Sequence, residues 1–213
     1  MDGPPRGYGG AREVAQLWKE LAAVSLVDER SSLSTGRQGR RERKRLRRLL
    51  RDQDRLNAKL AELYCVDALL ARASRFVEQG WIQHGWFTYV DPSGVRRIVT
   101  GCSPRITRTV SPDQVVATCL VGGIVNAAGG PQEARSQLVQ RSTELAWHAL
   151  FRGVHEPIRW CRSPAERAGH VMDLVRWNDS PGRTPSEVAA LLGRARALAR
   201  AEGERTRCRQ VVG

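Results

Sequence analysis

The sequence has few cysteines, and none of them stands in a short paired motif. The five cysteines are odd in number and lie far apart, at Cys65, Cys102, Cys119, Cys161 and Cys208. A disulfide-linked secreted scaffold or a zinc ribbon would show paired, closely spaced cysteines, so neither is indicated. A reducing cytoplasm is the simplest location for such a chain. With 213 residues, the chain is also long enough to bury a core without cross-links.

Long apolar runs and common enzyme motifs are also absent. No stretch approaches the ~18 apolar residues of a membrane span, and the N-terminus MDGPPRGYGG lacks the apolar segment of a signal peptide. The sequence contains no G-x-x-x-x-G-K-[ST] loop, no G-x-G-x-x-G fingerprint and no H-E-x-x-H pair. We therefore expect a soluble protein, and the common nucleotide-binding and metalloprotease chemistries lose their usual sequence support.

Acidic residues are scarce beside basic ones, and the basic excess lies in two segments. The chain has 35 Lys and Arg against 22 Asp and Glu, which gives a formal net charge of +13. Residues 37–51, RQGRRERKRLRRLLR, contribute nine cations and one acid, and residues 194–209 contribute six Arg and two Glu. The rest of the chain is therefore nearly neutral. Charge concentrated in this way is typical of a protein that binds a phosphate-rich partner.

The first third of the chain predicts a helical hairpin. Residues 1–10 have the composition of a disordered leader, and apolar residues then recur at helical spacing between Val14 and Val24. After Gly39 a long helix is expected, in which leucines step by three and four as in a helix-packing seam. We call Leu46, Leu49, Leu56, Leu60 and Leu63 the leucine seam. Residues 11–65 are thus expected to form a hairpin whose seam packs against the first helix or a second copy.

Residues 66–202 have the pattern of a compact helical domain, and residues 203–213 form a basic tail. A separate helix is expected from about Asp67 to Gly80, and a β-hairpin around residues 92–94. Ser111, Ser163 and Thr184 each precede a proline and have Gln or Glu three positions on, which predicts a capped helix start at Pro112, Pro164 and Pro185. The expected fold class is mainly α: an N-terminal helical hairpin with a long basic, leucine-rich helix, then this compact domain with one small β-hairpin.

Three motifs of this domain carry a resemblance. They are FVEQGWIQHGW, TCLVGGIVNAAGG and VRWNDSPGRTPSEVAALLGRA. Together they make residues 66–202 similar to a domain family of unknown function found in actinobacteria and their phages. The resemblance implies a small, mostly helical domain and brings no activity with it. The basic segment near residue 40 lies outside the similar region.

Trp177, Asn178 and Asp179 are a candidate polar site, in which Asp179 would act as a base. The motif lies between an apolar helix and the pair Pro181-Gly182, where Asx side chains commonly stabilise turns. We therefore expect Trp177 to anchor the core, and Asn178 and Asp179 to hold the loop between two helices.

Cys119 is a candidate nucleophile within a predicted helix, beside two glycines that would let another helix approach closely. A buried cysteine usually acts as a small apolar residue, and a nucleophile would need a base such as His148 or His170 supplied by the fold. A zinc ion would have to gather Cys102, Cys119, Cys161 and His170, and the short paired spacings of structural zinc sites are missing. We expect no catalytic residue, no metal and no cofactor.

The basic residues near the start of the long helix would repel one another if this surface were exposed only to solvent. A helix would place five like-charged pairs four residues apart, each unfavourable by roughly 0.2–0.5 kcal/mol. Residues 37–45 also contain no apolar side chain to bury. A polyanion would relieve this repulsion, and arginine suits the phosphates of RNA or DNA. The expected contacts are Arg37, Arg40, Arg41, Arg43, Lys44, Arg45, Arg47, Arg48 and Arg51.

The sequence therefore predicts a non-enzymatic cytoplasmic protein that contacts RNA, DNA or a ribonucleoprotein. An acidic protein or an anionic membrane surface would satisfy the same electrostatics. The alternative is a protein-interaction module in which the leucine seam forms a homo-oligomer or docks a protein partner. An enzyme using Cys119 or Asp179 is the least favoured hypothesis.

Overall fold

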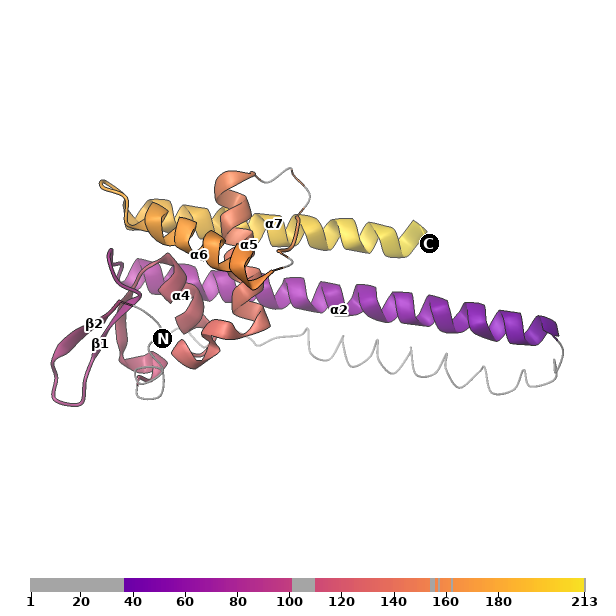
Figure 1. Ribbon diagram of the computed structural model, residues 1–213, viewed down its shortest axis with the longest axis horizontal. Coiled ribbons are helices and arrows are strands. Elements are labelled where there is room, and N and C mark those ends of the chain that lie inside the picture. The colour runs from indigo at the N-terminus through magenta and orange to yellow at the C-terminus, as the bar shows by residue number, and fades with distance from the viewer. Residues whose placement is uncertain (1–36, 101–109, 154–155, 157, 162, 213) are drawn as a thin grey trace, which may run out of the picture. The chain divides into compact units, whose positions relative to one another are not determined.

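The computed structural model of the chain describes residues 37–100, 110–153, 156, 158–161 and 163–212 (Figure 1). These residues are mainly helical, with one small antiparallel sheet, as the sequence predicted. The chain divides into two compact units, residues 1–52 and 53–213. The leader and the first predicted helix lie outside the described residues. Within the described ranges, no helix combines the length and the apolar character needed to cross a membrane.

Helix α2 (Arg37–Gln79) is one continuous helix of 43 residues. The prediction of a separate helix starting near Asp67 was wrong, because residues 40–79 contain neither glycine nor proline to interrupt a helix. The predicted end at Gly80 is confirmed, and its amide donates a hydrogen bond to the Phe76 carbonyl. A β-carbon at Gly80 would overlap the Val116 carbonyl oxygen, so this position needs glycine.

The predicted β-hairpin is present, and a third strand joins it. Strands β1 (Phe87–Val90), β2 (Arg96–Val99) and β3 (Val115–Thr118) form an antiparallel sheet in the order β2-β1-β3. Asp91 holds the hairpin turn, since its Oδ1 accepts hydrogen bonds from the amides of Ser93 and Val95, both at 3.0 Å.

The helix predicted to start at Pro112 is not formed. Gln114 Oε1 accepts a hydrogen bond from the Ser111 amide at 2.9 Å, as in a helix cap. The chain makes only the 3₁₀ helix η2 (Pro112–Gln114) and leaves it in an extended conformation at Val115. Residues 115–118 are rich in β-branched side chains and pair with β1, so a non-local partner decides their conformation.

The other two capped starts are confirmed. Helix α6 (Pro164–Asn178) begins with the Ser163 hydroxyl accepting a hydrogen bond from the Glu166 amide at 3.1 Å. Helix α7 (Pro185–Val212) begins with the Glu187 carboxylate accepting one from the Thr184 amide at 2.9 Å. Between the sheet and α6 the structure contains α4 (Leu120–Ala127), the 3₁₀ helix η3 (Pro131–Arg135) and α5 (Gln137–Phe151).

Helix α4 is buried along its whole length and forms the centre of the core. Its side chains belong to one apolar cluster with residues of α2, α5, α6 and α7, including Leu69, Leu145, Leu174 and Leu191. A β-carbon at Gly122 would overlap the carbonyl group of Trp86. The backbone before β1 therefore approaches Gly122. At Gly123 a neighbouring helix does approach, as the sequence suggested, since a β-carbon there would lie 3.4 Å from the Ala73 carbonyl oxygen of α2.

Candidate functional site

The strongest concentration of exposed positive charge in the described residues is on α2. Every residue from 40 to 51 is exposed, and we call this stretch the basic segment. None of its eight basic side chains forms an ion pair with another described residue, although the Arg51 guanidinium donates a hydrogen bond to the Arg47 carbonyl at 3.0 Å. The eight are Arg40, Arg41, Arg43, Lys44, Arg45, Arg47, Arg48 and Arg51. The side chain of Arg37 lies outside the described part.

The basic segment is two-sided. With about 100° between successive residues of an α-helix, the eight cations cover roughly 200° of its circumference. Leu46 and Leu49 lie in the remaining sector, where they are 41% and 51% exposed. Leu50 lies in the same sector and is also exposed. One side of the segment is therefore cationic and exposed, and the other carries an exposed apolar stripe.

The leucine seam changes its surroundings along α2. Leu46 and Leu49 are exposed, Leu56 and Leu60 are half-buried, and Leu63 is buried at 4% exposure. Leu63 is thus covered by other residues of the chain, and the exposed apolar surface of the seam lies mainly at Leu46 and Leu49.

The second basic segment, in α7, differs because its charges are largely compensated. Four of its six arginines form ion pairs, all between 2.6 and 3.2 Å. Arg196 and Arg200 pair with Asp67 of α2, Arg205 with Glu202, and Arg207 with Glu204. The net charge counted from the sequence therefore overstates the number of arginines without an ion-pair partner in this segment.

The Asn178 side chain is fully buried and makes a hydrogen-bond centre between three elements. Its Oδ1 accepts hydrogen bonds from the Trp81 indole N–H at 3.0 Å and from the Leu120 amide at 3.1 Å. Its Nδ2 donates to the Ile82 carbonyl at 3.2 Å and to a carboxylate oxygen of Asp179 at 2.9 Å. The amide thereby ties the end of α6 to the start of α4 and to the loop before β1.

The neighbours of Asn178 also have structural contacts. Asp179 accepts a hydrogen bond from the backbone amide of His84 at 2.9 Å, where His84 has a positive φ of 59°. Trp177 is half-buried against the core, and the Arg183 guanidinium lies over its ring. The contacts of this motif are structural, as the sequence suggested, but Asn178 and Asp179 bind the segment before β1 through Ile82 and His84 and not the loop between α6 and α7.

Cys119 is the N-cap of α4 and not an interior helical residue. Its sulfur accepts a hydrogen bond from the Gly122 amide at 3.2 Å, and burial raises the pKa of the thiol to about 11. The thiolate form that a nucleophile needs is therefore strongly disfavoured.

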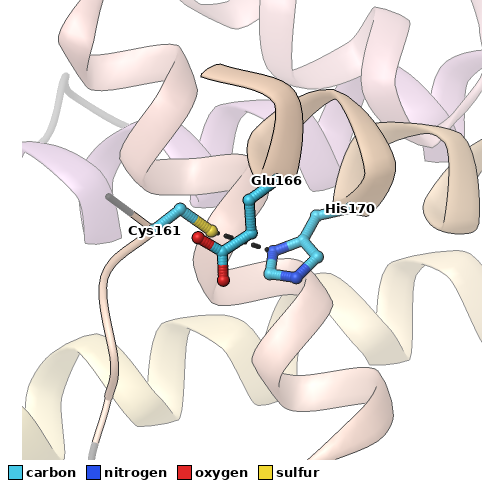
Figure 2. A group of neighbouring side chains, drawn as sticks. All are labelled: Cys161, Glu166 and His170. Carbon is cyan, nitrogen blue, oxygen red and sulfur yellow. Dashed lines mark hydrogen bonds between the residues drawn. The ribbon is translucent and has the colours of Figure 1, made fainter. Parts of the chain in front are cut away.

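A second cysteine has an imidazole beside it. Figure 2 shows Cys161, which precedes α6, with its sulfur directed at His170 on α6, and the Glu166 carboxylate next to both. Cys161 Sγ and His170 Nδ1 are 3.1 Å apart, and ligand atoms of all three residues lie within 4.8 Å of one another. Burial raises the pKa of the Cys161 thiol to about 11 and lowers the pKa of His170. We call these three residues the Cys-Glu-His cluster.

Neighbouring side chains hold the cluster in position. The His170 ring stacks on Trp147 with 3.6 Å between ring centroids, and the Trp147 indole donates a hydrogen bond to Asp173 at 3.1 Å. Arg167 donates one hydrogen bond to the Cys161 carbonyl at 3.1 Å and another, through Nε, to the buried carboxylate of Glu144 at 2.9 Å. Glu144 is 2% exposed.

The structure brings together only part of the zinc ligand set considered from sequence. Cys161 and His170 are in contact, Cys119 belongs to another part of the core, and Cys102 lies outside the described residues. Glu166 was identified only as a capping residue, because its position three residues after Ser163 explains its presence locally. Its spacing of four from His170, which places both on one face of α6, was the available signal.

Comparison with known proteins gives a family but no function. Residues 65–198, more than half of the chain, match the model of a family of unknown function (DUF6197). No curated protein and no solved structure matches the chain. The matched region contains the Cys-Glu-His cluster and Asn178, whereas the basic segment precedes it.

Proposed function

The chain belongs to the family of unknown function DUF6197, and we propose that it binds nucleic acid, free or within a ribonucleoprotein, without catalysing a reaction. The observation that carries this proposal is the basic segment of α2. Eight cations lie within twelve residues there, all exposed and none ion-paired with a described residue. A polyanion with closely spaced charges would relieve the electrostatic repulsion among these cations.

The contrast with α7 strengthens the assignment. Among the described residues, the basic segment has no ion-pair partner, whereas four arginines of α7 pair with Asp67, Glu202 and Glu204. Arginines present only for solubility would not be expected to divide in this way. Like-charged neighbours four residues apart along the basic segment repel one another. Phosphates placed along this side of the helix would turn the repulsion into attraction.

The geometry suits a phosphate backbone better than isolated anions. The twelve residues of the segment extend about 18 Å at 1.5 Å per residue, and duplex DNA carries one charge per about 1.7 Å of its axis. Arginine presents a planar set of donors that fits phosphate oxygens, and seven of the eight cations are arginines. Contacts of this kind position a protein on nucleic acid and do not select a sequence.

The test is whether the purified full-length protein binds nucleic acid in a salt-dependent manner. We expect co-purifying nucleic acid that lowers the 280 to 260 nm absorbance ratio and is removed by a high-salt wash. We also expect fluorescence anisotropy with labelled RNA and DNA oligonucleotides to show affinity that falls as salt rises. Absence of binding to both at low salt would overturn the proposal.

A second candidate function rests on the exposed Leu46 and Leu49. These side chains offer an apolar stripe on the side of the segment opposite the cations, where a second copy or another protein would bury it. Replacing both with Gln would then lower the molar mass measured by light scattering, with little change in the stability of the monomer. If the parent is monomeric at all concentrations tested, self-association through this stripe is excluded.

A further inference from the structure

We infer that the Cys-Glu-His cluster is a binding site for one transition-metal ion, and that Zn²⁺ is the ion it fits best. The three residues offer one sulfur, one carboxylate oxygen and one imidazole nitrogen, all within 4.8 Å of one another. Figure 2 shows the three side chains next to one another, with Cys161 on the segment before α6 and the other two on the helix. The site is independent of the nucleic-acid-binding proposal.

The distances are close to those of a coordinated ion. Zinc binds cysteine sulfur at about 2.3 Å and histidine nitrogen at about 2.0–2.1 Å, so a tetrahedral ion would separate the two ligands by about 3.5 Å. Cys161 Sγ and His170 Nδ1 are 3.1 Å apart. A movement of a few tenths of an ångström, within the range of a side-chain rotation, would therefore admit the ion between them.

The ligands are held in place before an ion arrives. Glu166 and His170 are four residues apart and so face the same side of α6, whose start is fixed by the Ser163 cap. The Trp147 ring sets the plane of the His170 imidazole, and the Arg167 hydrogen bond fixes the backbone of Cys161. Such supporting contacts reduce the ordering that binding would otherwise require.

The chemistry of the ligand set selects the class of ion. Mg²⁺ and Ca²⁺ take oxygen ligands, whereas a thiolate with an imidazole suits Zn²⁺ and related ions. Three protein ligands leave one position of a tetrahedral zinc ion for water. Glu166 is exposed while Cys161 is only 6% exposed, so the ion would enter from the Glu166 side.

The charges of such a site balance. The two positive charges of the ion would be matched by the thiolate of Cys161 and the carboxylate of Glu166, with His170 neutral. In the absence of an ion, burial keeps Cys161 as a thiol. Binding therefore replaces the thiol proton with the ion, and this proton passes to solvent.

Titration with Co²⁺ tests the site in the full-length protein. The protein is first dialysed against a chelator and a non-thiol reductant, and Co²⁺ is then added without oxygen. We expect a thiolate-to-Co²⁺ charge-transfer band and the visible bands of a tetrahedral ion, saturating at one ion per chain. An equivalent of Zn²⁺ should abolish these bands. A parent protein with no charge-transfer band would overturn the inference.

Variants assign the signal to the cluster. Cys161→Ser should remove the charge-transfer band. Glu166→Gln and His170→Gln should each weaken Co²⁺ binding by about 10-fold to 100-fold or more. Glu166 is exposed, so its variant stays informative even if His170→Gln fails to fold. Circular dichroism of each variant checks that the fold is retained.

Two matched controls distinguish the cluster from other thiols. Cys119→Ser changes a buried cysteine elsewhere in the core, and Cys208→Ser removes an exposed thiol. Both variants should bind Co²⁺ with the affinity and spectrum of the parent. Loss of the band in either control, or its persistence in Cys161→Ser, would assign the metal to another site and refute this one.

Discussion

The Asn178 amide oxygen accepts a hydrogen bond from the Trp81 indole N–H, 97 positions away in the chain, at 3.0 Å. Asn178 has no exposed surface. The same oxygen also accepts a hydrogen bond from the backbone amide of Leu120, the first residue of α4. A single side chain therefore holds the loop before the sheet against the helix at the centre of the core. Because its polar atoms are all engaged in these contacts, the role that we assign to Asn178 is to hold parts of the domain together.

Replacing Asn178 with Ala should destabilise the protein by about 2–4 kcal/mol, because it leaves the buried donors of Trp81 and Leu120 without partners. Chemical denaturation monitored by tryptophan fluorescence would measure this loss. The control is Asp54→Ala at an exposed position of α2, for which a change within about 0.5 kcal/mol is expected. Equal stability of the two variants would contradict the role given to Asn178.

Two glycines in helices should respond to alanine with opposite signs. Gly122→Ala would bring a methyl group into the Trp86 carbonyl, and a fixed backbone cannot give way as a side chain does. We expect a loss of about 3 kcal/mol or more, or failure to fold. Gly193→Ala in α7 meets nothing within 4 Å and should stabilise the protein by about 0.5–1 kcal/mol. Thermal unfolding of both variants tests the pair.

The signals that the sequence supplied correctly were local. The helix starts at Pro164 and Pro185 depend on a cap, a proline and an acid within four residues, and each start is formed. The hairpin turn depends on residues 91–95, in which the Asp91 carboxylate accepts hydrogen bonds from two backbone amides. Where the deciding contact lies within one turn of the chain, sequence pattern was sufficient.

The features that the sequence did not supply depend on distant partners. The cap at Ser111 is formed, yet pairing of residues 115–118 with β1 prevents a helix. The contact of Cys161 with His170 needs the segment before α6 to fold back on the helix, and the local explanation of Glu166 as a cap concealed it. The excess of positive charge in the basic segment was visible in the sequence, but the pairing of the α7 arginines with Asp67 was not.

The ion pairs of Glu202 should make stability depend on acid pH. Burial of the Glu202 carboxylate opposes its ionisation, but hydrogen bonds from Lys59 and Arg205 outweigh burial and lower the pKa below the ordinary value of 4.5. A lowered pKa in the folded state contributes stability above 4.5, and this contribution is lost as pH falls through the folded-state value. The link between α2 and α7 should therefore weaken in acid.

The variant Glu202→Gln isolates this contribution. At neutral pH it should be less stable than the parent, and the difference should shrink progressively as pH falls below 4.5. Urea denaturation at a series of pH values measures the difference directly. Glu204→Gln, which changes an exposed acid of the same helix, serves as control and should show a much smaller difference. A constant difference at all pH values would show that Glu202 acts through packing alone.

The basic segment makes the most direct prediction about function. If its side chains neutralise phosphates, each engaged cation releases counterions, and the logarithm of affinity should fall with the logarithm of salt concentration by about 0.7–0.9 per contact. Changing Arg43, Lys44, Arg47 and Arg48 to Gln should flatten this slope by up to about 3.6 and weaken binding to unrelated sequences about equally. The fold should be unchanged, because all four side chains are exposed.

Charge alone must be separated from position in this experiment. The double variants Arg43→Gln/Arg47→Gln and Arg194→Gln/Arg209→Gln remove the same charge from exposed positions of α2 and α7. Only the first should flatten the salt dependence measured by anisotropy if the basic segment is the binding element. Equal effects would mean that net charge and not this segment drives binding. A quadruple variant that binds as tightly as the parent, with the same slope, would instead direct attention to Leu46 and Leu49 as a protein-binding stripe.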